Sequence, residues 1–140
     1  MEFPWSKPKP TADDKRVLII DDDKEMRKTI ELWLKASGFI SLEARGGRTG
    51  WEMIQKDLPD LVILDVRMPQ LNGFEICKLV RSLEKTRHIP ILLLTGLDTM
   101  GEVEQGFDAG ATDYIAKPFD WDRLEKKVRT LLKLPDPPKS

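Results

Sequence analysis

The sequence predicts an α/β protein with a doubly wound parallel sheet, and three observations indicate this fold class. Short apolar runs alternate five times with segments that carry apolar residues at helical spacing. Most of these runs are continuous, which is typical of strands buried on both faces of a parallel sheet. Right-handed crossovers between such strands place helices on both faces. At 140 residues, the chain has the length of one such domain.

The first half of the chain supplies three strands and two helices. The strands are expected in VLII at 17–20, FISLEA at 39–44 and LVIL at 61–64. A helix is expected at 24–37, because apolar residues recur there at i, i+4, i+7 and i+8. This stripe consists of Met26, Ile30, Trp33 and Leu34. Gly38 suits the C-terminal end of that helix. A second helix is expected at 50–57, with Trp51 and Ile54 on one face.

The second half continues the alternation. A stripe of apolar residues predicts a helix at 74–83, and PILLL predicts a strand at 90–94. A short helix interrupted by glycines is expected at 99–108, followed by a strand in DYIA at 113–116. The last helix is predicted by a stripe made of Leu124, Val128, Leu131 and Leu132.

The two ends of the chain differ in composition from the alternating region. Residues 1–14 are rich in proline and lysine and have no apolar period, so we expect a flexible arm or a cloning remnant there. A partner-binding arm anchored by Trp5 is the alternative. The domain is expected at 15–134, and residues 135–140 have the composition of a linker.

Composition and charge exclude several classes of protein. The 23 Lys plus Arg nearly balance the 24 Asp plus Glu, which argues against a generally basic nucleic-acid binder. The single cysteine, Cys77, excludes an internal disulfide framework and a cysteine-based zinc site. The sequence has no membrane-length apolar run and no secretory signal at its start, so the cytoplasm is the expected compartment. No phosphate-binding glycine motif follows a strand, which disfavours mononucleotide binding.

Polar residues stand at the carboxyl ends of four expected strands. They are Asp21, Asp22 and Asp23 after the first strand, Asp65 after the third, Thr95 after the fourth and Lys117 after the fifth. Functional groups of doubly wound sheets gather at this edge, so we expect these side chains to meet. Asp23 is the exception, because its position favours capping the first helix.

Such a set of side chains suits phosphoryl transfer. Clustered carboxylates raise one another's pKa values unless a cation is present, and Mg²⁺ favours oxygen ligands of this kind. A lysine and a hydroxyl nearby can hold an anionic group. A carboxylate can also be the nucleophile, which gives an aspartyl phosphate.

Four segments, taken in this order, resemble the receiver domain of bacterial two-component response regulators. They are LIIDDDKEMR, LVILDVRMPQLNGFE, ILLLTG and GATDYIAKPF, and the resemblance covers residues 15–134. It implies a flavodoxin-like (βα)5 sheet with strand order 2-1-3-4-5. It also implies a signalling switch that takes a phosphoryl group from a histidine kinase or phosphotransfer protein. Such a switch is not an enzyme beyond assisting its own phosphorylation and autodephosphorylation.

The resemblance assigns the phosphoryl and metal sites residue by residue. Asp65 matches the phosphoacceptor, and Lys117 matches the lysine that pairs with the phosphoryl group. Asp22, Asp65 and the backbone carbonyl of Arg67 match the direct ligands of Mg²⁺, for which Mn²⁺ can substitute. Asp21 matches the neighbouring acid that acts through water.

The resemblance also assigns a switch and an output face. Thr95 matches the switch hydroxyl, Tyr114 the aromatic side chain that turns inward, and Lys117–Pro118 a peptide bond that is usually cis in the family. The fourth helix, fifth strand and fifth helix would form the face that contacts an effector domain, an effector protein or a second phosphorylated copy. No direct contact with nucleic acid or a membrane is expected.

One departure from the family pattern concerns the lifetime of the phosphoryl group. In the family, the residues matching Arg67 and Leu97 line the path of the attacking water. A leucine cannot orient water, and Arg67 can cover the phosphoryl group. We therefore expect slow autodephosphorylation.

Two alternatives stay open at this point. A pseudo-receiver binds partners without taking phosphate, but its usual mark is the loss of Asp65, Lys117 or an acidic partner, and all are present here. A haloacid-dehalogenase-like phosphatase also uses an aspartate and Mg²⁺, and residues 21–23 formally contain its Asp-x-Asp pattern. The sequence lacks the cap domain of that class.

Overall fold

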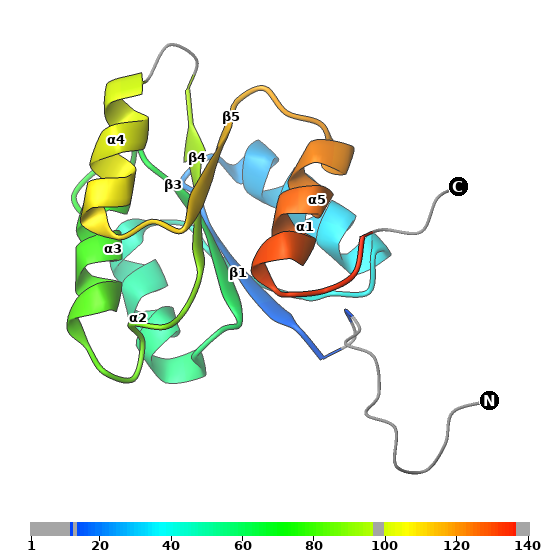
Figure 1. Ribbon diagram of the computed structural model, residues 1–140, viewed down its shortest axis with the longest axis horizontal. Helices are drawn as coiled ribbons and strands as arrows, with labels where there is room; N and C mark the ends of the chain where they lie inside the picture. Colours follow the sequence, from blue (N-terminus) through cyan, green and yellow to red (C-terminus); the bar gives the residue numbers. More distant parts are fainter. Residues whose placement is uncertain (1–11, 13, 97–99, 137–140) are drawn as a thin grey trace.

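The computed structural model describes residues 12, 14–96 and 100–136. Within them, five strands alternate with five helices (Figure 1). The strands are β1 (Arg16–Ile20), β2 (Ile40–Ala44), β3 (Leu61–Asp65), β4 (Ile91–Thr95) and β5 (Asp113–Ala116). The helices are α1 (Lys24–Ala36), α2 (Gly47–Asp57), α3 (Gly73–Ser82), α4 (Met100–Ala109) and α5 (Trp121–Leu131).

The sheet is parallel throughout, with the order β2-β1-β3-β4-β5. Helices α1 and α5 cover one face, and α2, α3 and α4 cover the other (Figure 1). Every residue of β3 and β4 is buried. Successive strand residues face opposite sides, so a strand covered on both sides is apolar along its whole length. The predicted doubly wound sheet with strand order 2-1-3-4-5 is confirmed.

The side chains of β1 show how the sheet divides the interior into two cores. Leu18 and Ile20 pack into the core that also contains apolar residues of α2 and α3. Val17 and Ile19 pack into the core that contains apolar residues of α1 and α5. Each core buries several large aliphatic side chains, each of which stabilises the fold by about 1.5–3 kcal/mol relative to exposure.

The register of the sheet places the strand ends side by side. Ile20 pairs with Leu64, and Thr95 pairs with Ala116. The residues that follow β1 and β5 therefore lie at the same edge as the last residues of β3 and β4. Ligands of doubly wound sheets bind at this edge.

Several element bounds differ from those predicted. Helix α2 begins at Gly47, three residues earlier than expected, because glycines are poor helix formers and left no helical signal in the sequence there. A Cβ atom on Gly47 would collide with the backbone oxygen of Leu71. Strands β3 and β4 each extend one residue further, so that Asp65 and Thr95 belong to the sheet itself.

Four predicted features fall wholly or partly outside the described residues. They are Trp5 with almost all of the expected N-terminal arm, Leu97, the first residue of the helix expected at 99–108, and residues 137–140 of the expected linker. In the part of the chain that is described, no helix has both the length and the apolar character needed to cross a membrane.

Candidate functional site

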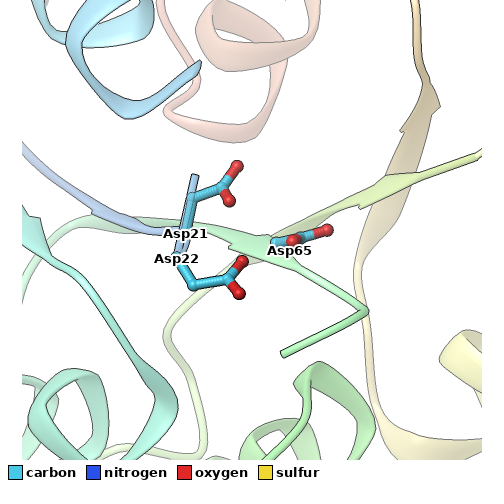
Figure 2. A group of neighbouring side chains, drawn as sticks. All are labelled: Asp21, Asp22 and Asp65. Atoms are coloured by element: carbon cyan, nitrogen blue, oxygen red, sulfur yellow. The ribbon is translucent and has the colours of Figure 1, made fainter. Parts of the chain in front are cut away.

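Three carboxylates converge at the carboxyl edge of the sheet (Figure 2). Asp21 and Asp22 follow β1, and Asp65 is the last residue of β3. One carboxylate oxygen from each lies within 4.8 Å of the other two. Asp21 is fully buried and Asp65 is nearly so, whereas Asp22 is exposed. The cluster is therefore open to solvent on one side.

A lysine that directly follows β5 faces this cluster. The Nζ atom of Lys117 lies 3.4 Å from Oδ1 of Asp65 and 3.8 Å from Oδ2 of Asp21. The backbone N–H of Lys117 donates to the carbonyl of Thr95 at 2.7 Å, which fixes the start of this loop against β4. The Lys117–Pro118 peptide bond is cis.

A cavity of about 350 Å³ opens beside the Asp65 carboxylate. It is lined by Asp65, Val66, Arg67, Leu94, Gly96 and Lys117. The side chain of Thr95 is buried, and its Oγ1 atom has no hydrogen-bond partner within the described residues. An unpaired buried hydroxyl is unfavourable unless a ligand completes its hydrogen bond.

The charge balance of the cluster favours a cation. Burial raises the pKa of Asp21 from 3.8 to about 6, although the hydrogen bond from the Asp23 N–H opposes this shift. Burial also raises the pKa of Asp65, while Lys117 opposes that shift. Three carboxyl groups face a single lysine at this site, so acidic groups outnumber basic ones there.

The donor set fits a hard divalent ion. Oδ2 of Asp21 is buried and, among the described residues, accepts no hydrogen bond. All the candidate side-chain donors are oxygens, which is the ligand type that Mg²⁺ favours. Asp21, Asp22 and Asp65 are therefore the side chains that could hold such an ion.

The start of α1 fixes the position of Asp21. Asp23 caps this helix as predicted, since its side chain accepts hydrogen bonds from Glu25 and Met26. The Asp23 N–H donates to Oδ1 of Asp21 at 2.9 Å, and Nη1 of Arg27 donates to the Asp21 carbonyl at 2.8 Å. The sequence interpretation missed Arg27. Its spacing from Ile30 and Leu34, both on the buried face of α1, is the signal that places it there.

The loop after β3 brings the N-terminus of α3 close to Asp65. A Cβ atom on Gly73 would lie 2.6 Å from the backbone oxygen of Asp65, so this approach requires glycine. The Gly73 N–H donates to the Val66 carbonyl at 3.0 Å. Asn72 and Glu75 then form a capping box at the start of the helix.

Two predicted site residues extend away from the cluster toward α4. Tyr114 is half-buried, and its ring meets that of Phe107 edge to face at 6.1 Å. The Arg67 side chain is 75% exposed and pairs with Glu102 of α4. Sequence reasoning did not find Glu102, because no periodic pattern links residues 35 positions apart.

Comparison with known proteins decides the family. Residues 17–129 match the family model for the response regulator receiver domain. The chain belongs to this family. As a receiver domain, it is a signalling switch of two-component systems, in which response regulators interact with histidine kinases and effector domains.

Individual relatives agree with this assignment. The receiver is 40% identical to the response regulator MprA of Mycolicibacterium vanbaalenii over 122 residues. This match covers 87% of this chain and 52% of that protein. It is 39% identical over 121 residues to the DNA-binding dual master transcriptional regulator RpaA of Synechocystis, covering 86% of this chain and 50% of RpaA. The chain thus spans about half the length of these curated relatives.

Solved structures show the same fold. A response regulator from Chloroflexus aurantiacus matches with a TM-score of 0.82 and 38% identity, over 85% of this chain and 98% of that one. The receiver domain of the sensor histidine kinase PA1611 from Pseudomonas aeruginosa has a TM-score of 0.79 and 26% identity, over 85% of this chain and 98% of that one. That structure has a magnesium ion coordinated in its active-site cleft.

Proposed function

We propose that this receiver takes a phosphoryl group onto Asp65 from a phosphohistidine of a histidine kinase or phosphotransfer protein. The convergence of Asp65 with Asp21, Asp22 and Lys117 beside an open cavity is the observation that carries the proposal. The family assignment supports it, because this edge of the sheet holds the same residue types in the receiver pattern.

The transfer needs only groups that lie at this edge. A carboxylate oxygen of Asp65 attacks the phosphorus, the P–N bond to the donor imidazole breaks, and its electron pair returns to the imidazole nitrogen. The product is an aspartyl phosphate. The Lys117 ammonium group offsets negative charge on the phosphoryl oxygens, and the Thr95 hydroxyl donates a hydrogen bond to one of them.

The acidic cluster would hold Mg²⁺ during this step. Asp22, Asp65 and the Arg67 carbonyl would be its direct ligands, and Asp21 would act through water. The bound ion would neutralise charge on the transferred group. The magnesium ion in the PA1611 receiver supports this assignment. Mn²⁺ would substitute because it accepts the same oxygen ligands.

Phosphorylation would reach partners through the face formed by α4, β5 and α5. Thr95 would move toward the phosphoryl group, and Tyr114 would turn inward after it. The region 15–134 would act as one switch domain in the cytoplasm, without direct contact to nucleic acid or membrane. The DNA-binding activity in the name of RpaA belongs to a protein of which this chain covers 50%, so an effector part of such a protein would carry it.

The proposed activity is confined to the domain's own phosphorylation and dephosphorylation. We expect slow loss of the phosphoryl group, because Arg67 lies at the rim of the cavity and can cover it. The second residue behind this expectation, Leu97, lies outside the described residues.

Intact-mass spectrometry after incubation with acetyl phosphate and Mg²⁺ tests the proposal. The parent should gain about 80 Da, the mass of one phosphoryl group on an activated nucleophile. Asp65→Asn should gain nothing, whereas Asp136→Asn, an exposed aspartate beyond α5, should behave like the parent. A folded parent without mass gain would favour the pseudo-receiver, and turnover of a small phosphate ester would favour the phosphatase.

A further inference from the structure

An ion pair joins the rim of the phosphoryl cavity to α4. Nε and Nη2 of Arg67 each lie 2.9 Å from Oε1 of Glu102. Arg67 stands two residues beyond Asp65 and lines the cavity, whereas Glu102 lies in the first turn of α4. A change in charge at Asp65 can therefore reach α4 through one side chain.

The first half of α4 is weakly anchored to the rest of the domain. The buried residues of the helix, Gly106 and Ala109, both lie in its second half, and Met100 is 75% exposed. Within the described ranges, the pair with Arg67 is the one ion pair that α4 makes. Few buried contacts give a segment low local stability, so loss of this pair affects the first turn most.

The two side chains differ in how well they are solvated once the pair has separated. The Glu102 side chain is 19% exposed, and its Oε2 atom is buried with no hydrogen-bond partner in the described part of the chain. Separation leaves this carboxylate poorly solvated and without a counter-charge. The Arg67 side chain is 75% exposed and can turn toward another anion while staying in water.

We propose that Glu102 and Arg67 form a latch on α4, and that a phosphoryl group on Asp65 opens it. The latch rests on the proposed phosphorylation of Asp65. A phosphoryl group carries more charge than a carboxylate and binds guanidinium through two parallel hydrogen bonds, so it competes for Arg67. Glu102 then loses its partner, and the first turn of α4 loosens at the proposed output face. Glu102 acts through Arg67 and is a positioning residue.

Reciprocity gives the latch a measurable consequence. Glu102 and the phosphoryl group compete for one guanidinium, so removing one competitor strengthens the binding of the other. The probe is beryllofluoride with Mg²⁺, a non-covalent phosphoryl analogue, titrated by calorimetry. Glu102→Gln should bind the analogue about 2–5-fold more tightly than the parent, which is the range expected for an ion pair at a protein surface.

A matched control separates the latch from a general effect of charge. Glu104 is exposed on the same helix and makes no ion pair among the described residues. Glu104→Gln changes the charge of α4 equally, and it should leave the affinity within twofold of the parent value because Glu104 does not hold Arg67. An equal gain from both substitutions would overturn the latch.

A double-mutant cycle tests whether Glu102 acts through Arg67. In an Arg67→Met background, Glu102→Gln should no longer change the affinity, because the shared guanidinium is gone. A glutamate that acted only on the helix dipole would give the same effect in both backgrounds, and that result would overturn the latch. If the parent binds the analogue and Glu102→Gln binds it no more tightly, the latch is overturned but the proposed function stands. A folded parent that fails to bind it would overturn the proposed function, and the latch with it.

Discussion

Replacement of Asp21 by asparagine should stabilise the domain at neutral pH in the absence of Mg²⁺. Asp21 is fully buried, and burial raises its pKa from 3.8 to about 6. Each unit of pKa difference between the folded and unfolded states corresponds to about 1.4 kcal/mol. The ionised carboxylate therefore lowers the free energy of unfolding by about 3 kcal/mol. Asparagine has nearly the same shape, and its Oδ1 can still accept the hydrogen bond from the Asp23 N–H.

The sign of the pH dependence follows from the direction of the shift. The folded protein holds the Asp21 proton more tightly than the unfolded chain, so the parent loses stability as pH rises from about 4 to about 6. Below about pH 4 the carboxyl group is neutral in both states, and the advantage of asparagine disappears. Above about pH 6 the advantage is complete, and it amounts to about 2–3 kcal/mol.

Urea unfolding with a metal chelator, at about pH 4 and about pH 7, measures this difference. Asp136→Asn, at an exposed position, serves as the control and should change stability little at either pH. Added Mg²⁺ should reduce the difference in free energy of unfolding between the parent and Asp21→Asn, because the cation offsets the buried charge. A variant no more stable than the parent at neutral pH, or a gain that is the same at both pH values, would refute the reasoning.

Two further substitutions test contacts at opposite edges of the sheet, since Arg81 binds the segments that precede β4 and β5 and Gly73 lies beside the end of β3. Arg81→Met should lower the free energy of unfolding by about 2–4 kcal/mol, because the guanidinium donates to the carbonyls of Gly110, Arg87 and Ile89 at 2.6–2.9 Å; an unchanged urea midpoint would contradict this. Gly73→Ala should lower the free energy of unfolding by about 1–3 kcal/mol and slow phosphorylation, since the added Cβ atom would lie 2.6 Å from the Asp65 backbone oxygen. The control Gly101→Ala meets no heavy atom within 4 Å and should be neutral or stabilising, and equal losses from the two substitutions would show that the close approach is unimportant.

The alternation of strands and helices was predictable because each burial pattern leaves a local signature. The runs VLII, LVIL and ILLLT are continuous since both faces of β1, β3 and β4 are covered. The start of α2 was not predictable, because glycines disfavour a helix locally. The structure explains two of them, since a Cβ atom on Gly47 would collide with Leu71 and one on Gly50 would collide with Ile20.

The candidate site was predictable for a related reason. Parallel strands end at one edge, so residues at strand ends meet whatever their separation in sequence, and Asp21, Asp65 and Lys117 do so. Their roles in phosphorylation stay predictions. Side-chain contacts between elements leave no periodic pattern, and the pair of Arg67 with Glu102 was therefore found only in the structure.

The identity of the phosphoacceptor is tested most directly by locating the acyl phosphate. After treatment with acetyl phosphate and Mg²⁺, borohydride reduces an aspartyl phosphate to homoserine, and peptide mass spectrometry identifies the altered residue. The account predicts homoserine at position 65 alone, and none when Mg²⁺ is omitted. Homoserine at Asp21 or Asp22, or phosphate carried on His88 without any homoserine, would contradict it.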